Sequence, residues 1–152
     1  MRGPNGEELP GAILFACNMN AVRSPMAAAL MRHLYGRWVF VESIGVRQGE
    51  LDPFAVSVMD EIGIDISGHK PRPFEDLMDM SFDIVVTLTP QAHHKALDLT
   101  AGYAVEVEHW PTPDPTAVVG SREQILESYR SVRDLLQKRI SERFLTAPAP
   151  NA

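Results

Sequence analysis

Two residues with chemical potential stand six positions apart near the start of the chain. Cys17 and Arg23 enclose the five residues Asn-Met-Asn-Ala-Val, and Ser24 and Pro25 follow them. A loop that joins a strand to a helix N-terminus turns successive backbone N–H groups inward and binds oxyanions. The planar guanidinium of Arg23 can hold two phosphate oxygens, and the same positive field favours the thiolate of Cys17. The spacing therefore predicts a phosphate-binding loop with a nucleophilic sulfur.

The same two residues also have a purely structural interpretation. A single cysteine at a strand end is usually a small buried hydrophobe, and an arginine at this distance arises by chance often enough to make the spacing alone weak. Ser24 adds weight to the functional interpretation, because its hydroxyl can donate a hydrogen bond to the sulfur. The apolar run before the loop and the helical pattern after it favour the functional interpretation further.

Hydrolysis of a phosphate ester also needs a proton for the departing oxygen, which a carboxylic acid held over the loop can supply. Asp114 lies in the proline-rich segment Trp-Pro-Thr-Pro-Asp-Pro that follows the last expected strand. An aspartate beside prolines is common in turns, but together with the cysteine loop the general-acid role is favoured. The same carboxylate would then activate the water that hydrolyses the thiophosphate, so this chemistry needs no metal.

The composition sets the class of protein that carries this loop. The chain has 152 residues, 45% of them hydrophobic and 22% charged, which fits one globular domain of ordinary size. Its formal charge of −6 argues against binding nucleic acid or coating an anionic membrane. Cys17 is the only cysteine, which excludes intramolecular disulfides, cysteine-rich zinc sites and Cys-x-x-Cys redox chemistry. With no long apolar run and no signal-peptide pattern, we expect a cytoplasmic protein.

Apolar runs alternate with segments of helical period along the chain. Ser24 and Asp52 stand where helix N-caps are expected. The order predicts an α/β fold: a four-stranded parallel sheet with helices on both faces and a ligand site beyond the carboxyl ends of its strands. We expect one domain over 11–146, with short tails at 1–10 and 147–152. Strands are expected at 11–16, 38–44, 82–88 and 103–107, and helices at 24–35, 53–62, 90–97 and 122–144, with a short helix within 71–80.

Beyond these patterns, the chain resembles the low-molecular-weight protein tyrosine phosphatase family over about residues 12–144. The resemblance implies the phosphatase-type sheet, a cysteinyl-phosphate intermediate and no cofactor. It also implies that Cys17 is the nucleophile, that Arg23 binds phosphate and that Asp114 is the general acid. The matching segments are 17–25, 42–45 (Glu-Ser-Ile-Gly), 63–69 (Gly-Ile-Asp-Ile-Ser-Gly-His), 82–83 and 114–115.

The resemblance also assigns supporting roles around the loop. Asn20 matches a family asparagine in the left-handed conformation, and Ser24 tunes the thiolate. Ser43 and His69 complete a network that holds the loop. The residues expected to surround the phosphate are Asn18, Met19, Asn20, Ala21, Val22, Arg23 and Ser24.

Some positions depart from the family pattern. Met19 stands where the family usually has glycine, which makes the loop bulkier. Val22 replaces a second cysteine that can protect the nucleophile as a disulfide. Thr116 and Ala117 follow Asp114-Pro115 where eukaryotic members carry tyrosines, which removes an aromatic wall of the site.

Two segments, 83–89 and 108–110, are also similar to the arsenate reductases that share this fold. Reductases coupled to thioredoxin relay oxidation through further cysteines, and Thr89 stands at the position that would hold one. Cys17 alone cannot operate that relay, which leaves transfer of arsenate to an external small thiol as one alternative. A second alternative is an oxyanion-binding module without turnover, because a side chain at Met19 can crowd the loop.

The function favoured by the sequence is hydrolysis of phosphate monoesters through a cysteinyl-phosphate, in the manner of protein tyrosine phosphatases. The expected partners are phosphorylated proteins or small phosphate esters, with phosphate, arsenate and vanadate as inorganic ligands. Neither nucleic acid nor a membrane is expected as a partner. His93 and His94 are expected on the surface, because adjacent helical residues point about 100° apart and cannot share a metal ion. His109 is expected either to line the pocket or to pack its loop.

Overall fold

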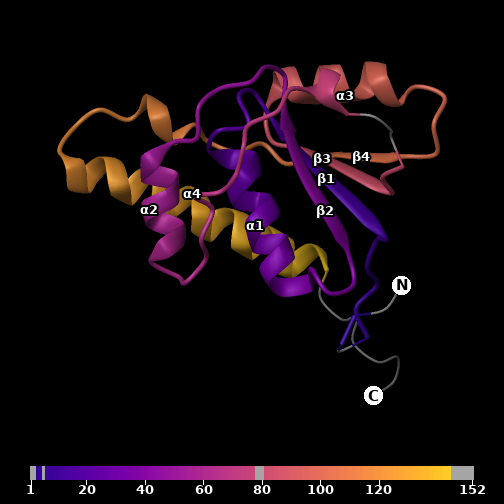
Figure 1. Ribbon diagram of the computed structural model, residues 1–152, viewed down its shortest axis with the longest axis horizontal. Coiled ribbons are helices and arrows are strands. Elements are labelled where there is room, and N and C mark those ends of the chain that lie inside the picture. Colours follow the sequence, from indigo (N-terminus) through magenta and orange to yellow (C-terminus); the bar gives the residue numbers. More distant parts are fainter. Residues whose placement is uncertain (1–2, 5, 78–80, 145–152) are drawn as a thin grey trace.

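Short apolar segments form the sheet, and the segments between them form helices. The computed structural model describes residues 3–4, 6–77 and 81–144 (Figure 1). The strands are β1 (Ala12–Cys17), β2 (Phe40–Gly45), β3 (Ile84–Thr87) and β4 (Glu106–His109). The helices are α1 (Arg23–Tyr35), α2 (Pro53–Asp60), α3 (Pro90–Thr100) and α4 (Arg122–Arg143), with the short 3-10 helices η1 (Phe74–Asp76) and η2 (Pro115–Ala117).

The four strands form one parallel sheet in the order β2-β1-β3-β4. This confirms the fold class predicted from the alternating pattern. Cys17 is the last residue of β1 and pairs with Gly45, the last residue of β2. The carboxyl ends of these two strands therefore finish side by side, at the edge where parallel sheets bind their ligands.

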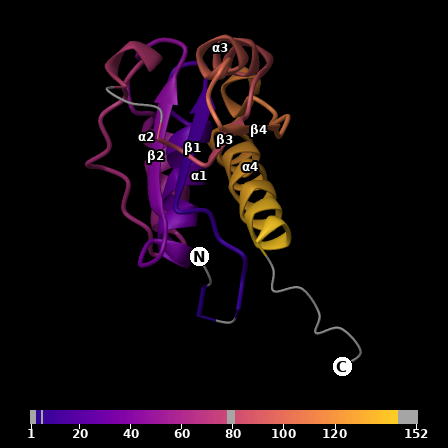
Figure 2. The same cartoon turned by 90° about the vertical axis from the view of Figure 1, so that its right-hand side faces the viewer.

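Side chains of the central strand β1 alternate between two apolar layers. Ile13 and Phe15 pack into the larger layer, which α1, α2 and α4 cover. Leu14 and Ala16 pack into a smaller layer that α3 covers. Figure 1 shows α3 on one side of the sheet and the other three helices on the opposite side, and Figure 2 gives the same arrangement from the side. Burial on both faces explains why β1 is almost uniformly apolar.

The last helix carries the apolar face expected from its period. Tyr129, Val132, Leu136 and Ile140 are all buried on α4. Ser121 begins this helix with a capping box, because its side chain and that of Gln124 each accept a hydrogen bond from the other's backbone N–H.

Helix α4 is also tied to α2 by a buried arginine. The Arg133 side chain donates to the carbonyl of Val58 at 2.8 Å and to Glu61 at 2.9 Å.

Within the described residues no helix is both long and apolar enough to cross a membrane.

Several expected boundaries were wrong in ways that tertiary contacts explain. The fourth strand covers Glu106–His109 and not 103–107, because α3 continues to Thr100 and Gly102, at a φ of +87°, turns the chain before it pairs with β3. The second strand begins at Phe40, because the N–H groups of the two residues before it donate to the carbonyl of Tyr35.

The first strand and the first helix differ from the expected ranges by one residue, and other elements are shorter than expected. The second helix ends at Asp60 and not at 62, and the third strand is limited to Ile84–Thr87 by the register of its neighbours. Within 71–80 the structure forms only η1, and 78–80 lie outside the described residues, as do residues 147–152 of the expected tail. From the expected tail 1–10, Leu9 packs into the larger apolar layer.

We predict that Leu136→Ala lowers the free energy of unfolding by about 2–5 kcal/mol, because the side chain is fully buried between α4 and the sheet and its removal leaves a cavity. Urea denaturation followed by circular dichroism measures the change. Leu97→Ala is the matched control, since that leucine is 48% exposed and its truncation should change stability by no more than about 0.5 kcal/mol. Equal losses in the two variants would contradict the assignment of the core.

Candidate active site

The loop after β1 turns its backbone carbonyls away from the space that it encloses. The carbonyl oxygens of residues 17–21 each accept a hydrogen bond from outside the loop. The pairs are Cys17 O with Val46 N (3.0 Å), Asn18 O with Arg47 N (2.9 Å), Met19 O with Gly49 N (2.8 Å), Asn20 O with His69 Nε2 (3.1 Å) and Ala21 O with Asp52 N (3.2 Å). In a trans peptide the N–H points opposite to the C=O. The N–H groups of residues 18–22 therefore turn to the other side, which is the arrangement of an anion-binding nest.

Asn20 holds this loop from within. It is fully buried and has a φ of +55°, the left-handed conformation expected for it. The side-chain NH2 group of Asn20 donates to Ser24 Oγ at 2.8 Å and to Ser43 Oγ at 3.0 Å. The side-chain oxygen Oδ1 accepts from the backbone N–H of Arg72 at 2.9 Å. With the His69 contact to the Asn20 backbone, the structure brings together every residue of the expected supporting network.

The sulfur of Cys17 lies at the bottom of the loop beside a hydroxyl. Cys17 is buried, and its Sγ lies 3.0 Å from Ser24 Oγ. The hydroxyl accepts from Asn20 and lies 3.2 Å from the carbonyl of Ile44, to which it donates. A hydroxyl has a single hydrogen, so it can donate to Ile44 when the sulfur is a thiol or to the sulfur when that is a thiolate.

The expectation that Ser24 caps the first helix was wrong. Helix α1 begins at Arg23, and its N-cap residue is Val22, which makes no side-chain capping bond. The Ser24 hydroxyl instead makes its hydrogen bonds within the buried network. Asp52, by contrast, caps α2 as expected, because its side chain accepts from the N–H of Phe54 at 2.8 Å.

Arg23 and Asp114 face the same cleft as the sulfur. This front cleft has a volume of about 600 Å3, and Cys17, Arg23 and Asp114 all line it. The guanidinium of Arg23 donates to the carbonyl of Thr112 at 3.1 Å, which fixes its approach to the loop. Ala21 and Val22 line the cleft as well. The three residues expected to perform chemistry therefore come together, although almost a hundred positions separate the first from the last.

Asp114 is ionised in this state of the site. Burial raises the pKa of its carboxyl, but hydrogen bonds from the Thr116 hydroxyl (2.6 Å) and backbone N–H (2.9 Å) lower it, and so does the charge of Arg23. The net pKa lies below the ordinary value of an aspartic acid. Its surroundings therefore favour the carboxylate form of Asp114.

Met19 and Asn18 are accommodated at the rim of the loop. The Met19 side chain is 40% exposed and packs directly against Gly49. A Cβ at position 49 would lie only 2.9 Å from the Met19 Cβ, so the absence of a side chain at Gly49 makes room for the methionine. The side chain of Asn18 accepts from Thr89 Oγ1 at 2.7 Å, which joins the loop to the residue that caps α3. Both side chains line the front cleft without entering the buried network.

Some residues of the site were missed because the sequence gave no local signal for them. Phe54 and Tyr129 line the front cleft, and their rings lie 5.4 Å apart. The Tyr129 hydroxyl donates to Asp52 at 2.6 Å, and burial together with that carboxylate raises the pKa of the phenol. The period of α4 marks Tyr129 only as apolar, and nothing local connects it with Phe54. These rings give the cleft an aromatic wall.

The histidines outside the network have structural surroundings. His93 is half-buried, and its Nδ1 lies 2.9 Å from the hydroxyl of Thr87, so the expectation that it is a surface residue was wrong. His109 contacts the same hydroxyl at 3.0 Å, and its ring lies tilted against that of His93 with the ring centroids 4.6 Å apart, which places it in the packing between β4 and α3. His94 is exposed and lies near Asp98.

Comparison with known proteins identifies the family. A family model described as low molecular weight phosphotyrosine protein phosphatase matches residues 12–147. The chain belongs to this family. Family membership agrees with the parallel sheet and with the placement of the loop at the carboxyl end of β1.

Relatives within this phosphatase family include reductases as well as phosphatases. The arsenate reductase of Bacillus subtilis strain 168 is 34% identical over 130 residues, which cover 86% of this chain and 92% of the relative. A solved arsenate reductase in its phosphate-binding state has a TM-score of 0.73 at 28% identity, covering 87% of this chain and 95% of that one. The arginine phosphatase YwlE, solved as a mutant with a phosphorylated active-site serine, has a TM-score of 0.70 at 28% identity, covering 87% and 94%.

We predict that Asn20→Ala and Asn20→Gly both weaken the binding of inorganic phosphate by about tenfold or more, because each removes the amide that holds Ser24 and Ser43. Asn20→Ala should also be less stable than Asn20→Gly by about 1 kcal/mol, because a positive φ strains the backbone of alanine but not that of glycine. Calorimetric titration and urea denaturation measure the two effects. Full affinity in the glycine variant would mean that only the backbone conformation matters.

Proposed function

We propose that the protein hydrolyses phosphate monoesters through a phosphorylated cysteine, in the manner of a protein tyrosine phosphatase. The observation that carries the proposal is the convergence of a buried sulfur, a nest of backbone N–H groups, an arginine and a carboxylate on one cleft. Each component meets a separate requirement of phosphoryl transfer: nucleophile, charge stabilisation and proton transfer.

The first chemical step breaks the ester bond. The thiolate of Cys17 attacks phosphorus in line with the leaving oxygen, so an S–P bond forms as the P–O bond breaks. The loop N–H groups and the guanidinium of Arg23 stabilise the equatorial oxygens. Asp114 transfers a proton to the leaving oxygen, and the alcohol or phenol departs.

The second step regenerates the cysteine. Asp114, now a carboxylate, takes a proton from water, and the resulting hydroxide attacks phosphorus. The S–P bond breaks, inorganic phosphate leaves, and the sulfur returns to the thiolate. The Ser24 hydroxyl can donate to that thiolate, because it lies 3.0 Å away.

The aromatic wall of the front cleft supports an aryl phosphate as substrate. Phe54 lines the cleft together with the loop, and Arg122 lies over the Phe54 ring at 5.6 Å. A phenyl ring beside this wall buries apolar surface and gains favourable ring contacts. A phosphotyrosine side chain has the required shape, which favours phosphorylated proteins over purely aliphatic esters.

Thiol-coupled arsenate reduction is the second candidate, and the naming of several relatives as arsenate reductases favours it. Arsenate would condense with Cys17, releasing water and forming an S–As bond. An external thiol would then attack the Cys17 sulfur, so that a mixed disulfide forms, the S–As bond electrons pass to arsenic and arsenite departs. A second external thiol would reduce the mixed disulfide, because Cys17 has no cysteine partner in the chain.

We predict that wild-type protein hydrolyses p-nitrophenyl phosphate without added metal or thiol, and that Cys17→Ser abolishes this turnover while it retains phosphate binding. A serine hydroxyl in this loop is a far weaker nucleophile than a thiolate. Release of nitrophenol and calorimetric titration measure the two quantities.

The same preparation distinguishes the alternatives. Arsenite production from arsenate that depends on added glutathione, with no nitrophenol release, would replace the hydrolase proposal with the reductase. Phosphate binding without either reaction would leave a binding module. Undiminished hydrolysis by Cys17→Ser would exclude the covalent mechanism.

We predict that Asp114→Asn slows phenyl phosphate by about 10²–10⁴-fold but p-nitrophenyl phosphate far less, because only the poorer leaving group needs the proton. Asp98→Asn, an exposed aspartate on α3, is the control and should change neither rate. Similar slowing of both substrates would place the acid elsewhere.

The lowered pKa of Asp114 also fixes the direction of the pH profile. Because the free carboxylate is ionised, the transferred proton must enter with the monoanion of the ester. The wild-type kcat/KM for phenyl phosphate should therefore fall as pH rises above about 6, where phosphate esters lose their second proton. Stopped assays across pH 4.5 to 8 measure this profile, and a kcat/KM that rises over the same range would contradict it.

A further inference from the structure

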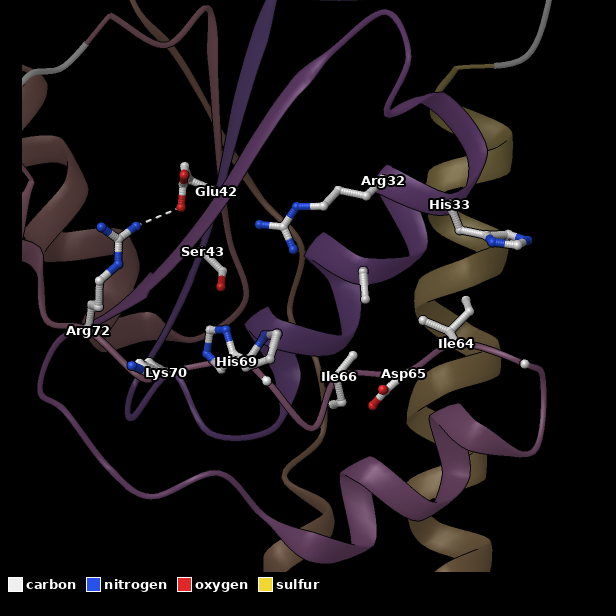
Figure 3. A pocket seen from close by; sticks show the side chains of 14 residues that line it. Arg32, His33, Glu42, Ser43, Ile64, Asp65, Ile66, His69, Lys70 and Arg72 are labelled. Atoms are coloured by element: carbon white, nitrogen blue, oxygen red, sulfur yellow. Dashed lines mark hydrogen bonds and ion pairs between the residues drawn. The ribbon is translucent and has the colours of Figure 1, made fainter.

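A second cleft lies behind the loop, on the side away from the sulfur. This rear cleft has a volume of about 750 Å3 and is lined by parts of α1, β2 and the segment 63–72. Figure 3 shows its side chains, which come from α1 on one side, from β2 on the other, and from the segment 63–72 between them. Its volume is in the range of sites that bind small molecules.

Cationic side chains dominate the rear cleft. The Arg32 guanidinium donates to the carbonyl of Val41 at 2.9 Å, which is the only hydrogen bond of this side chain within the described part of the chain. A guanidinium has five N–H groups, so most of its donors remain for a ligand. Figure 3 shows the Arg32 guanidinium extending from α1 toward β2, across the cleft. Lys70 also lines the cleft and forms no ion pair among the residues that the structure describes.

The acidic side chains of the cleft are already engaged. Glu42 accepts from the guanidinium of Arg72 at 2.6 Å, so these two charges offset each other. Asp65 accepts from the backbone N–H of Ser67 at 2.8 Å. The bond from Ser67 does not remove the charge of Asp65. Neither Arg32 nor Lys70 forms an ion pair among the described residues, however, and with Glu42 paired to Arg72 the lining of the cleft keeps an excess of positive charge.

His69 joins the rear cleft to the catalytic loop. Its Nε2 donates to the carbonyl of Asn20 at 3.1 Å, because a carbonyl can only accept, so Nδ1 is the nitrogen left for other partners. Burial lowers the pKa of the His69 imidazole, and the positive charges of Arg32 and Arg72 lower this pKa further. The hydrogen bond to Asn20 and the negative charge of Glu42 raise the pKa but do not outweigh these effects. An anion between these groups would relieve the repulsion and favour the protonated ring.

We propose that the rear cleft is a second anion site that takes the phosphate group of a small molecule, with the Arg32 guanidinium as its principal donor and the His69 Nδ1 as a second donor once the bound anion has led the ring to take up a proton. The planar fork of an arginine matches two oxygens of a phosphate, and Lys70 supplies the second positive charge that a dianion requires. The cleft is much larger than one phosphate ion, which leaves room for the organic part of an ester.

The rear site is coupled to the front loop through Asn20. Ser43, His69 and Arg72 all line the rear cleft, and each of them bonds Asn20. A ligand that fixes His69 stabilises the same loop conformation that an oxyanion at Cys17 requires. Because linkage is reciprocal, each ligand then raises the affinity for the other. The site does not depend on turnover at Cys17.

Titration followed by NMR of the imidazole and amide resonances tests this site, with inorganic phosphate and glycerol 3-phosphate as probes. Arg23→Gln is the starting protein, because it weakens binding at the front loop and leaves the rear cleft intact. In this background we expect both probes to shift the His69 imidazole and the Asn20 amide. Adding Arg32→Gln should weaken that response by about tenfold or more.

Arg37→Gln is the matched control, because it removes the same charge from an exposed arginine that does not line the rear cleft. It should leave the response unchanged. Tighter binding of glycerol 3-phosphate than of phosphate identifies an ester as the ligand, and the reverse identifies the free ion. An unaltered response in the Arg32→Gln protein, or a His69 that responds to neither probe in the Arg23→Gln protein, would overturn the proposal.

Discussion

The left-handed backbone of Asn20 is the constraint on which the rest of this site depends. Such a conformation costs a non-glycine residue roughly 1 kcal/mol. At Asn20 the three hydrogen bonds of the fully buried side chain offset that cost. The reversal at Asn20 lets the loop curl back on itself, so that its carbonyls can all reach donors outside. Without that curl, the N–H groups would not converge on one anion.

The donors that hold the loop open come mainly from the segment after β2. Cys17 and Gly45 pair at the ends of neighbouring strands, and residues 46–52 then wrap around the loop on the way to α2. Gly45 is required there, because a Cβ would lie 2.7 Å from the backbone nitrogen of Asn20 and 2.7 Å from the carbonyl oxygen of Arg47. Backbone atoms on both sides cannot move aside. The sheet order and the anion nest are therefore parts of one structure.

Periodicity and motif spacing predicted what is local. The apolar run of β1 and the long apolar face of α4 each lie within one segment, and each was predicted to within one residue at either end. The position of β4 was wrong because the register of an edge strand is set by its partner, β3, which is distant in sequence.

The side chains that prediction missed share a similar cause. Arg72 reaches Asn20 through its backbone N–H, which any residue other than proline provides, so its type carries no signal. Phe54 and Tyr129 form a wall only once α2 and α4 pack together. For Ser24 the predicted contact with the sulfur is present and only the predicted role as a helix cap was wrong, because the hydroxyl is buried beside Cys17 and Asn20. Tertiary contacts decided each of these outcomes.

The Ser24 hydroxyl gives the loop a way to respond to charge on the sulfur. Asn20 occupies one lone pair of that oxygen, so the single hydroxyl hydrogen has two acceptors to choose between, Ile44 O at 3.2 Å and Cys17 Sγ at 3.0 Å. A thiolate attracts the hydrogen more strongly than a neutral carbonyl does. In the hydrolysis proposed above, the sulfur would lose its negative charge while it carries the phosphoryl group, and the Ile44 carbonyl would then be the better acceptor. The hydrogen would therefore stabilise the sulfur before attack and after release, when the sulfur is charged.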